Sequence, residues 1–330
     1  MPSPTILISG AQGQLGQALS WIDQQRHPSS IVLLGRSELD ITQPDSIARA
    51  LDLHRPDILI NAAAYTAVDK AESEPEAARL INGVAPGLLA QACATRGIGM
   101  LHVSTDYVFD GKAAEPYAED APTGPVSVYG SSKLQGEQAV LTTLPSAVVL
   151  RTSWIFSQFG HNFLKTMLRL GRERKELSVV ADQVGGPSYA PHIAQVLLNL
   201  AARMHTAPGA SAPACMESVG LSPDDTGTTA ISGEKHSPLQ HRVPSGIYHF
   251  AGQPAVSWHE FAQEIFHQAV ALGVLDHAPT LTPIRTEQYP TPAQRPAQSG
   301  LSQDKLDELL GANAIVRDWR DGVRHSLLAL

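Results

Sequence analysis

The sequence contains few residues of the kinds that build disulfide frameworks or metal sites. Only two of its 330 residues are cysteines, Cys93 and Cys215, and they do not have the spacing of metal ligands. Two cysteines imply no disulfide framework, which favours a reducing compartment. The 13 histidines are scattered, and His259 and His267, which could share a helix face, are accompanied by no third ligand. We therefore predict no metal site.

Long apolar runs and an excess of positive charge are also missing. No run approaches the ~18 apolar residues that suggest a membrane helix, and residues 1–4 lack a charged and then apolar secretion signal. The net charge of −8 makes generic binding of polyanions unfavourable, so an anionic ligand must be met by local cations. We expect a cytoplasmic protein whose partner is a small molecule, with no nucleic-acid or membrane partner.

A glycine-rich turn follows the first apolar run of the chain. Residues 5–9 are predicted to form a buried strand and residues 17–22 a helix. Between them, Gly10, Gly13 and Gly16 follow a G-x-x-G-x-x-G spacing. Glycines at such a turn allow the backbone to approach a pyrophosphate, whose charge the helix N-terminus accepts. This position in the chain favours dinucleotide binding over an ordinary glycine-rich turn.

The end of the second predicted strand, residues 31–34, indicates which dinucleotide is bound. An acidic residue there would hydrogen-bond the ribose hydroxyls and disfavour a 2′-phosphate. The sequence instead has Gly35, Arg36 and Ser37, and a guanidinium suits a 2′-phosphate. We predict NADPH, with NADH possible; the alternative for Arg36 is a solvated surface residue.

Tyr129 and Lys133 are four residues apart, which places a phenol and an ammonium on one face of a helix. A nearby ammonium favours the phenolate and would make the tyrosine a better proton relay. Upstream, the hydroxyl of Thr105 could hold a substrate carbonyl beside the phenol. These three residues are predicted to be catalytic, protonating an oxygen while the cofactor delivers hydride to its carbon. Alone the pair could be a surface Tyr and Lys, but the glycine-rich turn supports the catalytic interpretation.

Strand-like runs alternate with helical segments up to residue 152, which predicts an α/β fold. The expected architecture is a Rossmann-like, doubly wound parallel sheet with a smaller C-terminal α+β substrate domain. Further strands are predicted at 58–61, 100–104, 147–150, 177–181 and 246–252, and helices at 75–96, 131–143, 161–173, 258–272, 306–310 and 319–328. The candidate residues follow strand ends, where ligands bind in open α/β sheets.

Three parts of the chain are predicted. Residues 1–152, with returning segments near 188–204 and 245–252, would form the NADP-binding Rossmann domain. Residues 153–187 and 253–330 would form the substrate domain. Residues 205–245, rich in Pro, Gly, Ser and Thr, are predicted to be a surface insertion that could be mobile.

The chain resembles the extended short-chain dehydrogenase/reductase family, and within it the branch that reduces dTDP-4-dehydrorhamnose. The glycine-rich turn, Thr105, and Tyr129 with Lys133 are the general features of this resemblance. More specific motifs agree in order along nearly the whole chain, at residues 61–74, 104–109, 151–154, 162–169, 182–183 and 289–296.

The resemblance implies NADPH-dependent reduction of the C4 keto group of dTDP-4-dehydro-β-L-rhamnose to dTDP-L-rhamnose, the last step of dTDP-rhamnose biosynthesis for polysaccharides. It implies that Tyr129 protonates the alkoxide, Lys133 lowers the Tyr129 pKa and bonds the ribose, and Thr105 holds the C4 oxygen. The implied cofactor-binding residues are Gly10, Gly13, Gln14, Leu15, Gly16, Arg36, Asp40, Ile41, Ala64, Thr66, Tyr129 and Lys133. The implied substrate-binding residues are Thr105, Asp106, Tyr107, Trp154, Asn162, Lys165 and Arg295, the last three for the diphosphate.

Two departures and two alternatives accompany the resemblance. Some members form metal-linked dimers through a glutamate that matches Ala18 here, so we expect a monomer or a weak homodimer. The 205–245 segment is longer than the usual connection. Another nucleotide-sugar 4-ketoreductase or epimerase would use the same catalytic residues. A non-catalytic, dinucleotide-binding regulatory subunit of the methionine adenosyltransferase type is the other alternative, and the presence of Tyr129 and Lys133 argues against it.

Overall fold

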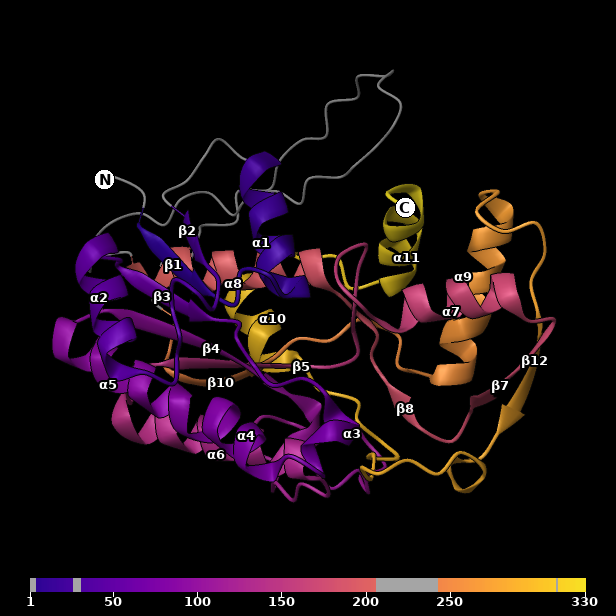
Figure 1. The fold of residues 1–330 in the computed structure, drawn as a ribbon, viewed down its shortest axis with the longest axis horizontal. Helices are drawn as coiled ribbons and strands as arrows, with labels where there is room; N and C mark the ends of the chain where they lie inside the picture. Colours follow the sequence, from indigo (N-terminus) through magenta and orange to yellow (C-terminus); the bar gives the residue numbers. More distant parts are fainter. Residues whose placement is uncertain (1–3, 26–30, 206–242, 313) are drawn as a thin grey trace.

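The structure, a computed structural model, describes residues 4–25, 31–205, 243–312 and 314–330 (Figure 1). Its described part contains a six-stranded sheet in the order β10-β5-β4-β3-β1-β2, in which all strand pairs are parallel. The strands are β1 (Ile6–Ser9), β2 (Ile31–Leu34), β3 (Ile58–Asn61), β4 (Gly99–Thr105), β5 (Val148–Thr152) and β10 (Gly246–His249). The predicted Rossmann-like fold class is confirmed. The predicted insertion at 205–245 lies almost entirely outside the described residues.

Strand register brings the functional segments to one edge of this sheet. The last residue of β1, Ser9, pairs with Leu34 of β2 and with Asn61 of β3, and Thr105 of β4 pairs with Thr152 of β5. The chain order reverses at β1, whose two neighbours are β2 and β3. Ligands bind at such a switch point, outside the carboxyl ends of the strands.

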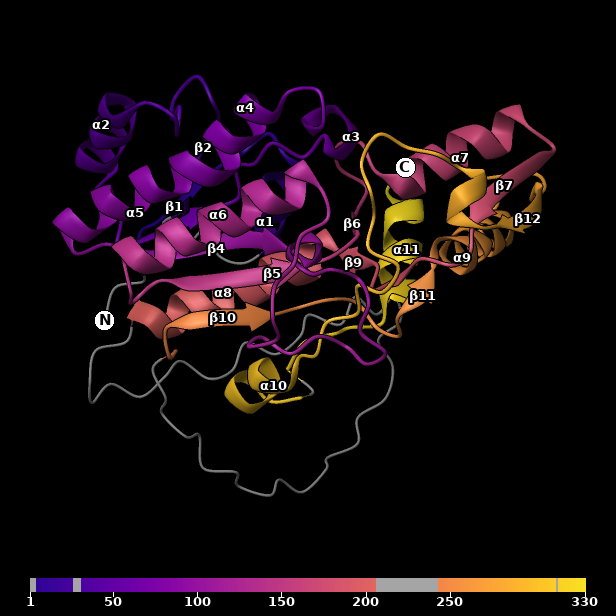
Figure 2. The ribbon, with the colours of Figure 1, turned by 90° about the horizontal axis from the view of Figure 1, so that it is seen from below.

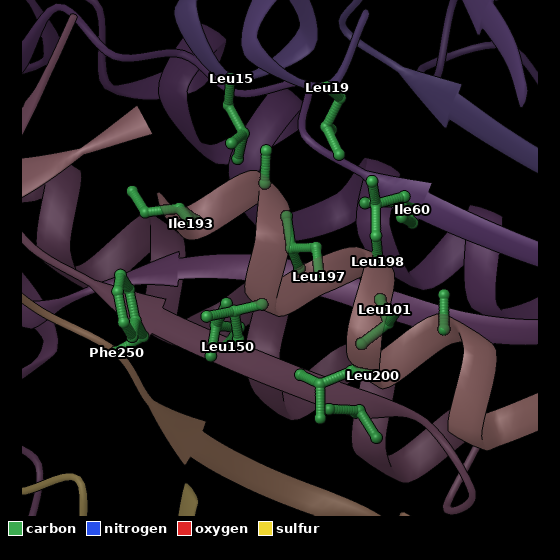
Figure 3. Packing of buried hydrophobic residues seen from close by; sticks show 14 of the residues in the cluster. Leu15, Leu19, Ile60, Leu101, Leu150, Ile193, Leu197, Leu198, Leu200 and Phe250 are labelled. Carbon is green, nitrogen blue, oxygen red and sulfur yellow. The ribbon is translucent and has the colours of Figure 1, made fainter. Parts of the chain in front are cut away.

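Helices cover both faces of the sheet (Figures 1 and 2). One face packs against α1 (Gln14–Gln25) and α8 (Ala190–His205), and the other against α2 (Pro44–His54), α5 (Ala85–Arg96) and α6 (Val128–Thr143). Figure 3 shows leucines of α8, including Leu197 and Leu198, facing Ile60 and Leu150 of the sheet. The strands are largely apolar before their carboxyl ends because both of their faces are buried. Ala18 of α1 is fully buried in this core.

The predicted helix at 75–96 is three helical segments in succession. They are α4 (Pro75–Ala78), a π-helical stretch η1 (Arg79–Val84) and α5. Inside the wider turn, Asn82 is buried and its main-chain oxygen lies against Gly136 of α6, where any side chain would clash. Single π-turns of this kind occur frequently at functional sites. The short helix α3 (Val68–Ala71) precedes this region.

A second lobe has its own apolar core. Three helices, α7 (Phe163–Glu173), α9 (Trp258–Ala271) and α11 (Trp319–Leu328), pack there with the parallel pair β7 (Glu176–Val180) and β12 (Thr280–Ile284) (Figure 1). Two short pairs complete it: β8 (Val184–Gly185) with β11 (Val256–Ser257), and β6 (Ile155–Phe156) with β9 (Ser188–Tyr189). A capping box formed by Ser257 and Glu260 opens α9, where the sequence predicted a helix at 258–272.

One C-terminal element lies apart from the second lobe. The helix α10 (Asp304–Leu310) packs against β10, and its Leu306 and Leu310 belong to the core beneath the sheet (Figure 2). This differs from the predicted range 253–330 for the substrate domain, because apolar spacing in a short helix does not identify its partner. Among the described residues, no helix is long and apolar enough to cross a membrane.

Candidate active site

A cavity of about 720 Å³ lies where the carboxyl edge of the sheet meets the second lobe. Most of the predicted site residues line it: Gly10, Gly13, Gln14, Leu15, Arg36, Asp40, Ile41, Ala64, Thr66, Thr105, Asp106, Tyr107, Tyr129, Lys133, Trp154 and Asn162. Gly16, Lys165 and Arg295 do not line it. The structure therefore brings these predicted residues together around one cavity and leaves three of them outside its lining.

The glycine-rich turn forms one end of the cavity. Gly10 has φ +82°, and a Cβ there would lie 2.7 Å from the main-chain nitrogen of Ala63. A Cβ on Gly16 would clash with the carbonyl oxygen of Gly10, so this glycine serves the turn from behind the cavity wall. The helix α1 begins at Gln14 and presents its N-terminus there. A bare backbone beside a helix N-terminus fits the pyrophosphate of a dinucleotide.

Arg36 lies at the rim of this end, after β2. Its side chain is 78% exposed, and its Nε lies 4.0 Å from Oδ2 of Asp40. Hydrogen bonds from Thr42 lower the pKa of the Asp40 carboxyl. The guanidinium is therefore in place beside the cavity and is held only by a weak, exposed ion pair.

The three predicted catalytic residues converge in the middle of the cavity. Thr105 is the last residue of β4, and Tyr129 and Lys133 lie in the first turns of α6, which Ser127 caps through the backbone N–H of Gly130. The Thr105 hydroxyl donates to Oδ1 of Asp106 over 2.9 Å. The Lys133 ammonium donates to the carbonyl oxygen of Val103 over 2.7 Å.

Burial has the largest effect on the pKa values of Tyr129 and Lys133. It raises the pKa of Tyr129 to about 12, opposed by a hydrogen bond with the Thr105 side chain. It lowers the pKa of Lys133 to about 8, opposed by the charge of Glu137. The expectation that Lys133 lowers the Tyr129 pKa is wrong for this structure, because desolvation disfavours both charged forms and the ammonium is directed at Val103. A phenol that stays protonated at neutral pH suits a proton donor.

Asp106 and Tyr107 continue the wall beyond Thr105. Asp106 is almost fully buried, and its Oδ2 has no hydrogen-bond partner among the described residues. Burial raises the pKa of this carboxyl to about 6, opposed by the nearby hydroxyls of Ser299 and Thr105, which favour the carboxylate. The Tyr107 ring meets the Tyr129 ring edge to face at 5.5 Å. An unpaired buried oxygen facing a cavity can accept a hydrogen bond from a ligand hydroxyl.

The wall formed by the second lobe contains two stacked tryptophans. Trp154 lies just after β5 with φ +44°, a conformation that costs a bulky residue roughly 1–3 kcal/mol. Its ring lies parallel to that of Trp258, at 3.5 Å between centroids and 4° between planes. Trp258 was not predicted as a site residue. The capping box placed it at the start of a helix, but nothing local in the sequence indicates that it reaches Trp154.

The three residues predicted for a diphosphate already have protein partners. Asn162 caps α7 by accepting from the backbone N–H of Lys165, and its amide donates to Oε1 of Gln14 over 2.9 Å. Lys165 Nζ donates to the Gln158 carbonyl oxygen, and Arg295 pairs with Asp69 over 2.8 Å. Lys165 and Arg295 therefore point to neighbouring protein atoms outside the cavity lining.

Asn82 was likewise not predicted to contribute to the site. Its Oδ1 accepts from the backbone N–H of Tyr65 over 2.8 Å, and its Nδ2 donates to the hydroxyl of Ser132. That hydroxyl donates in turn to the carbonyl oxygen of Tyr129. Asn82 thus ties the segment after β3 to the first turn of α6. An asparagine within a helical stretch was the only local signal, and the contact depends on the π-helical turn.

Comparison with known proteins gives a consistent result. The family model described as the RmlD substrate binding domain matches residues 4–212 and 228–330. A dTDP-4-dehydrorhamnose reductase of Aggregatibacter actinomycetemcomitans is 41% identical over 97% of each chain. A probable dTDP-4,6-dihydroxy-2-methyloxan-3-one 4-ketoreductase of Streptomyces antibioticus is 37% identical over 97% of this chain and 93% of its own. The crystal structure of a dTDP-4-dehydrorhamnose reductase of Bacillus anthracis with NADP superposes over 100% of both chains, with a TM-score of 0.79 and 31% identity.

Proposed function

The chain belongs to the RmlD family, and on that premise we propose that it is a dTDP-4-dehydrorhamnose reductase that uses NADPH, with NADH possible. It reduces the C4 keto group of dTDP-4-dehydro-β-L-rhamnose to give dTDP-L-rhamnose. The observation that carries the proposal is the single cavity that joins a glycine-rich cradle, the Thr105–Tyr129–Lys133 group and an aromatic wall. We infer that the dinucleotide binds toward the glycine-rich turn and the nucleotide sugar toward the aromatic wall, with their reacting atoms meeting at Tyr129.

The glycine-rich end would hold the cofactor. NADPH, when bound, supplies the hydride. The backbone around Gly10 and Gly13 and the N-terminus of α1 would bind its pyrophosphate, and Arg36 would face the 2′-phosphate. The remaining cofactor contacts that we propose are with Gln14, Leu15, Asp40, Ile41, Ala64 and Thr66, all of which line the cavity, and with Gly16, which shapes the turn behind it.

Proton transfer is assigned to Tyr129. Its phenol is neutral at physiological pH, and burial raises its pKa further above the ordinary value, so it carries a proton that it can donate to the C4 oxygen as negative charge develops there. The Thr105 hydroxyl would hold that oxygen beside the phenol. Lys133 would bond the nicotinamide ribose and orient it, in addition to its present contact with the Val103 carbonyl.

The sugar and its diphosphate would lie toward the second lobe. Asp106 would accept a sugar hydroxyl, and Tyr107 and Trp154 would pack against the ring. Asn162 would face the diphosphate, while Lys165 and Arg295 would contribute to it only by exchanging their contacts with Gln158 and Asp69. This division assigns NADP to residues 1–152 with 188–204 and 245–252, and the nucleotide sugar to 153–187 and most of 253–330. We also propose a monomer or weak homodimer, since Ala18 is buried beneath α8.

The test is NADPH consumption by the purified protein, supplied with dTDP-glucose, a 4,6-dehydratase and a 3,5-epimerase. Consumption that requires both helper enzymes and yields dTDP-rhamnose supports the proposal. Consumption with the dehydratase alone would instead indicate a ketoreductase for the un-epimerised keto sugar. Tight NADPH binding without any consumption would favour a regulatory subunit.

A further inference from the structure

One wall of the cavity depends on a contact that the proposed mechanism does not use. Trp154 and Trp258 both line the cavity, and their rings are stacked in van der Waals contact. Trp154 follows strand β5 of the large sheet, whereas Trp258 opens α9 of the second lobe. The stack therefore lies just beyond the large sheet, against the core of the second lobe, at the position where the sugar would bind.

The backbone around Trp154 is held by the segment that follows β8. The hydroxyl of Ser153 donates to the carbonyl oxygen of Gly186 over 2.7 Å, and the backbone N–H of Ser188 donates to the carbonyl oxygen of Trp154 over 3.1 Å. These bonds hold the main chain of Trp154 at its unusual positive φ. The indole therefore projects from a main chain of fixed position, and its own contacts determine its rotamer.

The indole of Trp154 also lies closely on Gly185. A Cβ at Gly185 would lie 2.6 Å from Cε2 of Trp154 and 2.6 Å from Oγ of Ser299, so this position accepts only glycine without displacing the indole and that hydroxyl. Gly185 and Trp258 are joined by one short ribbon, in which Gly185 pairs with Val256 and Val184 with Ser257. Trp258 follows Ser257 directly, so the β8–β11 ribbon carries both groups that contact the indole.

Trp258 in turn packs against two phenylalanine rings of the second lobe. Its ring lies 4.7 Å from that of Phe163, the first residue of α7, and 6.4 Å from that of Phe261 in the next turn of α9. Phe163 directly follows Asn162, which lines the cavity and caps α7. Trp258 thus connects the indole of Trp154 with the start of α7.

We propose that Trp258 and Gly185 are positioning residues that fix the Trp154 indole as the binding surface for the sugar of the nucleotide-sugar substrate. The proposal rests on the proposed function, because it assigns that substrate to this wall. A flat, rigid aromatic face suits the apolar C–H face of a deoxy sugar. Without its contacts with Trp258 and Gly185, the Trp154 ring would sample several rotamers, and substrate binding would be weaker. The parts of the cavity around Tyr129 and the NADPH site would be unchanged.

The test uses two variants, each of which changes a different contact of the Trp154 indole. Trp258→Leu removes the stacked ring, and Gly185→Ala pushes a methyl group against the indole. For both we expect the KM for the keto sugar and the Kd for dTDP-rhamnose to rise about tenfold, with kcat within about threefold and NADPH affinity unchanged. Trp258→Phe, which keeps an aromatic face, should recover most of the affinity lost in Trp258→Leu.

The chain offers a matched control for each variant. Trp21→Phe changes a tryptophan of α1 that does not line the cavity. Gly300→Ala adds a methyl group whose nearest neighbours, atoms of Pro116, are at 3.8 Å. Both should keep wild-type KM. Near-UV circular dichroism, which responds to stacked indoles, should change in Trp258→Phe and far less in Trp21→Phe.

Two outcomes would contradict the positioning role proposed for Trp258 and Gly185. One is wild-type KM and product affinity in both Trp258→Leu and Gly185→Ala. The other is a parallel loss of kcat, NADPH affinity and thermal midpoint, which would indicate general unfolding. A wild-type protein without reductase activity would instead contradict the proposed function; the circular dichroism comparison would still decide whether the indole pair exists.

Discussion

At the scale of single residues, Tyr129 should separate chemistry from binding. Tyr129→Phe removes the proton donor but leaves the glycine-rich cradle and Arg36 in place, so we expect turnover to fall by at least ~10²-fold while NADPH binding is retained. Steady-state kinetics and a fluorescence titration with NADPH measure the two effects. Tyr107→Phe, which alters the neighbouring ring of the same cavity, is the control and should keep far more activity. Comparable turnover in wild type and Tyr129→Phe would remove Tyr129 as the donor.

The buried carboxyl of Asp106 should lower the free energy of unfolding at neutral pH. Burial raises its folded-state pKa to about 6 from an ordinary value of 3.8, so the folded protein holds this proton more tightly than the unfolded chain. The associated stability is present below pH ~4 and is lost as the pH rises through 6, by about 3 kcal/mol. Asp106→Asn lacks this loss. Its free energy of unfolding, relative to wild type, should therefore increase between pH 4 and pH 7, with a higher KM for the sugar.

A pH-independent difference between the two proteins would mean that Asp106 does not titrate in this range.

The site residues themselves were largely predictable because their signals are local: a glycine spacing, a strand end, and a tyrosine and lysine one turn apart. The Tyr129 pKa was predicted wrongly because the i, i+4 spacing contains no information about burial. Trp258 could not be predicted as a partner of Trp154, since their contact depends on how segments far apart in the sequence pack in the second lobe.

At the scale of secondary-structure elements, a buried ion pair joins α6 to β5. Glu137 accepts two hydrogen bonds from Arg151, and both side chains are 2% exposed. Glu137 lies one turn beyond Lys133 on the same helix, so this pair also fixes the catalytic turns of α6. Glu137→Gln leaves a buried guanidinium with a weakened partner, and we expect a loss of about 3–5 kcal/mol in the free energy of unfolding.

Chemical denaturation measures that loss, and Glu173→Gln in the exposed pair with Arg169 is the matched control, expected to cost no more than about 1 kcal/mol. Equal effects of the two substitutions would contradict the role given to Glu137. The strands of the first lobe and its helices α1, α5 and α6 were predicted, whereas no helix was predicted at α2 or α8. The π-helical turn at 79–84 and the pairing of β7 with β12 were not predicted either, because both depend on contacts distant in the sequence.

At the scale of the whole molecule, the fold class and the position of the cavity follow from strand order alone. The alternation of strands and helices predicts a parallel sheet, and a parallel sheet places its ligands at one edge. The division into lobes is less predictable, since α10 returns to the core beneath the sheet although it lies far along the chain. A short amphipathic helix has an apolar face, but its sequence does not specify which core that face joins.

The same architecture predicts how ligands stabilise the protein. A dinucleotide that binds only the folded state at 100 times its Kd adds about 2.7 kcal/mol to the free energy of unfolding. Because Arg36 is exposed and held only by a weak pair with Asp40, its interaction with a 2′-phosphate should be favourable. We expect NADPH to raise the thermal midpoint more than NADH at equal concentration. Arg36→Ala should remove that difference while leaving the midpoint without ligand unchanged; a difference that persists would place the 2′-phosphate elsewhere.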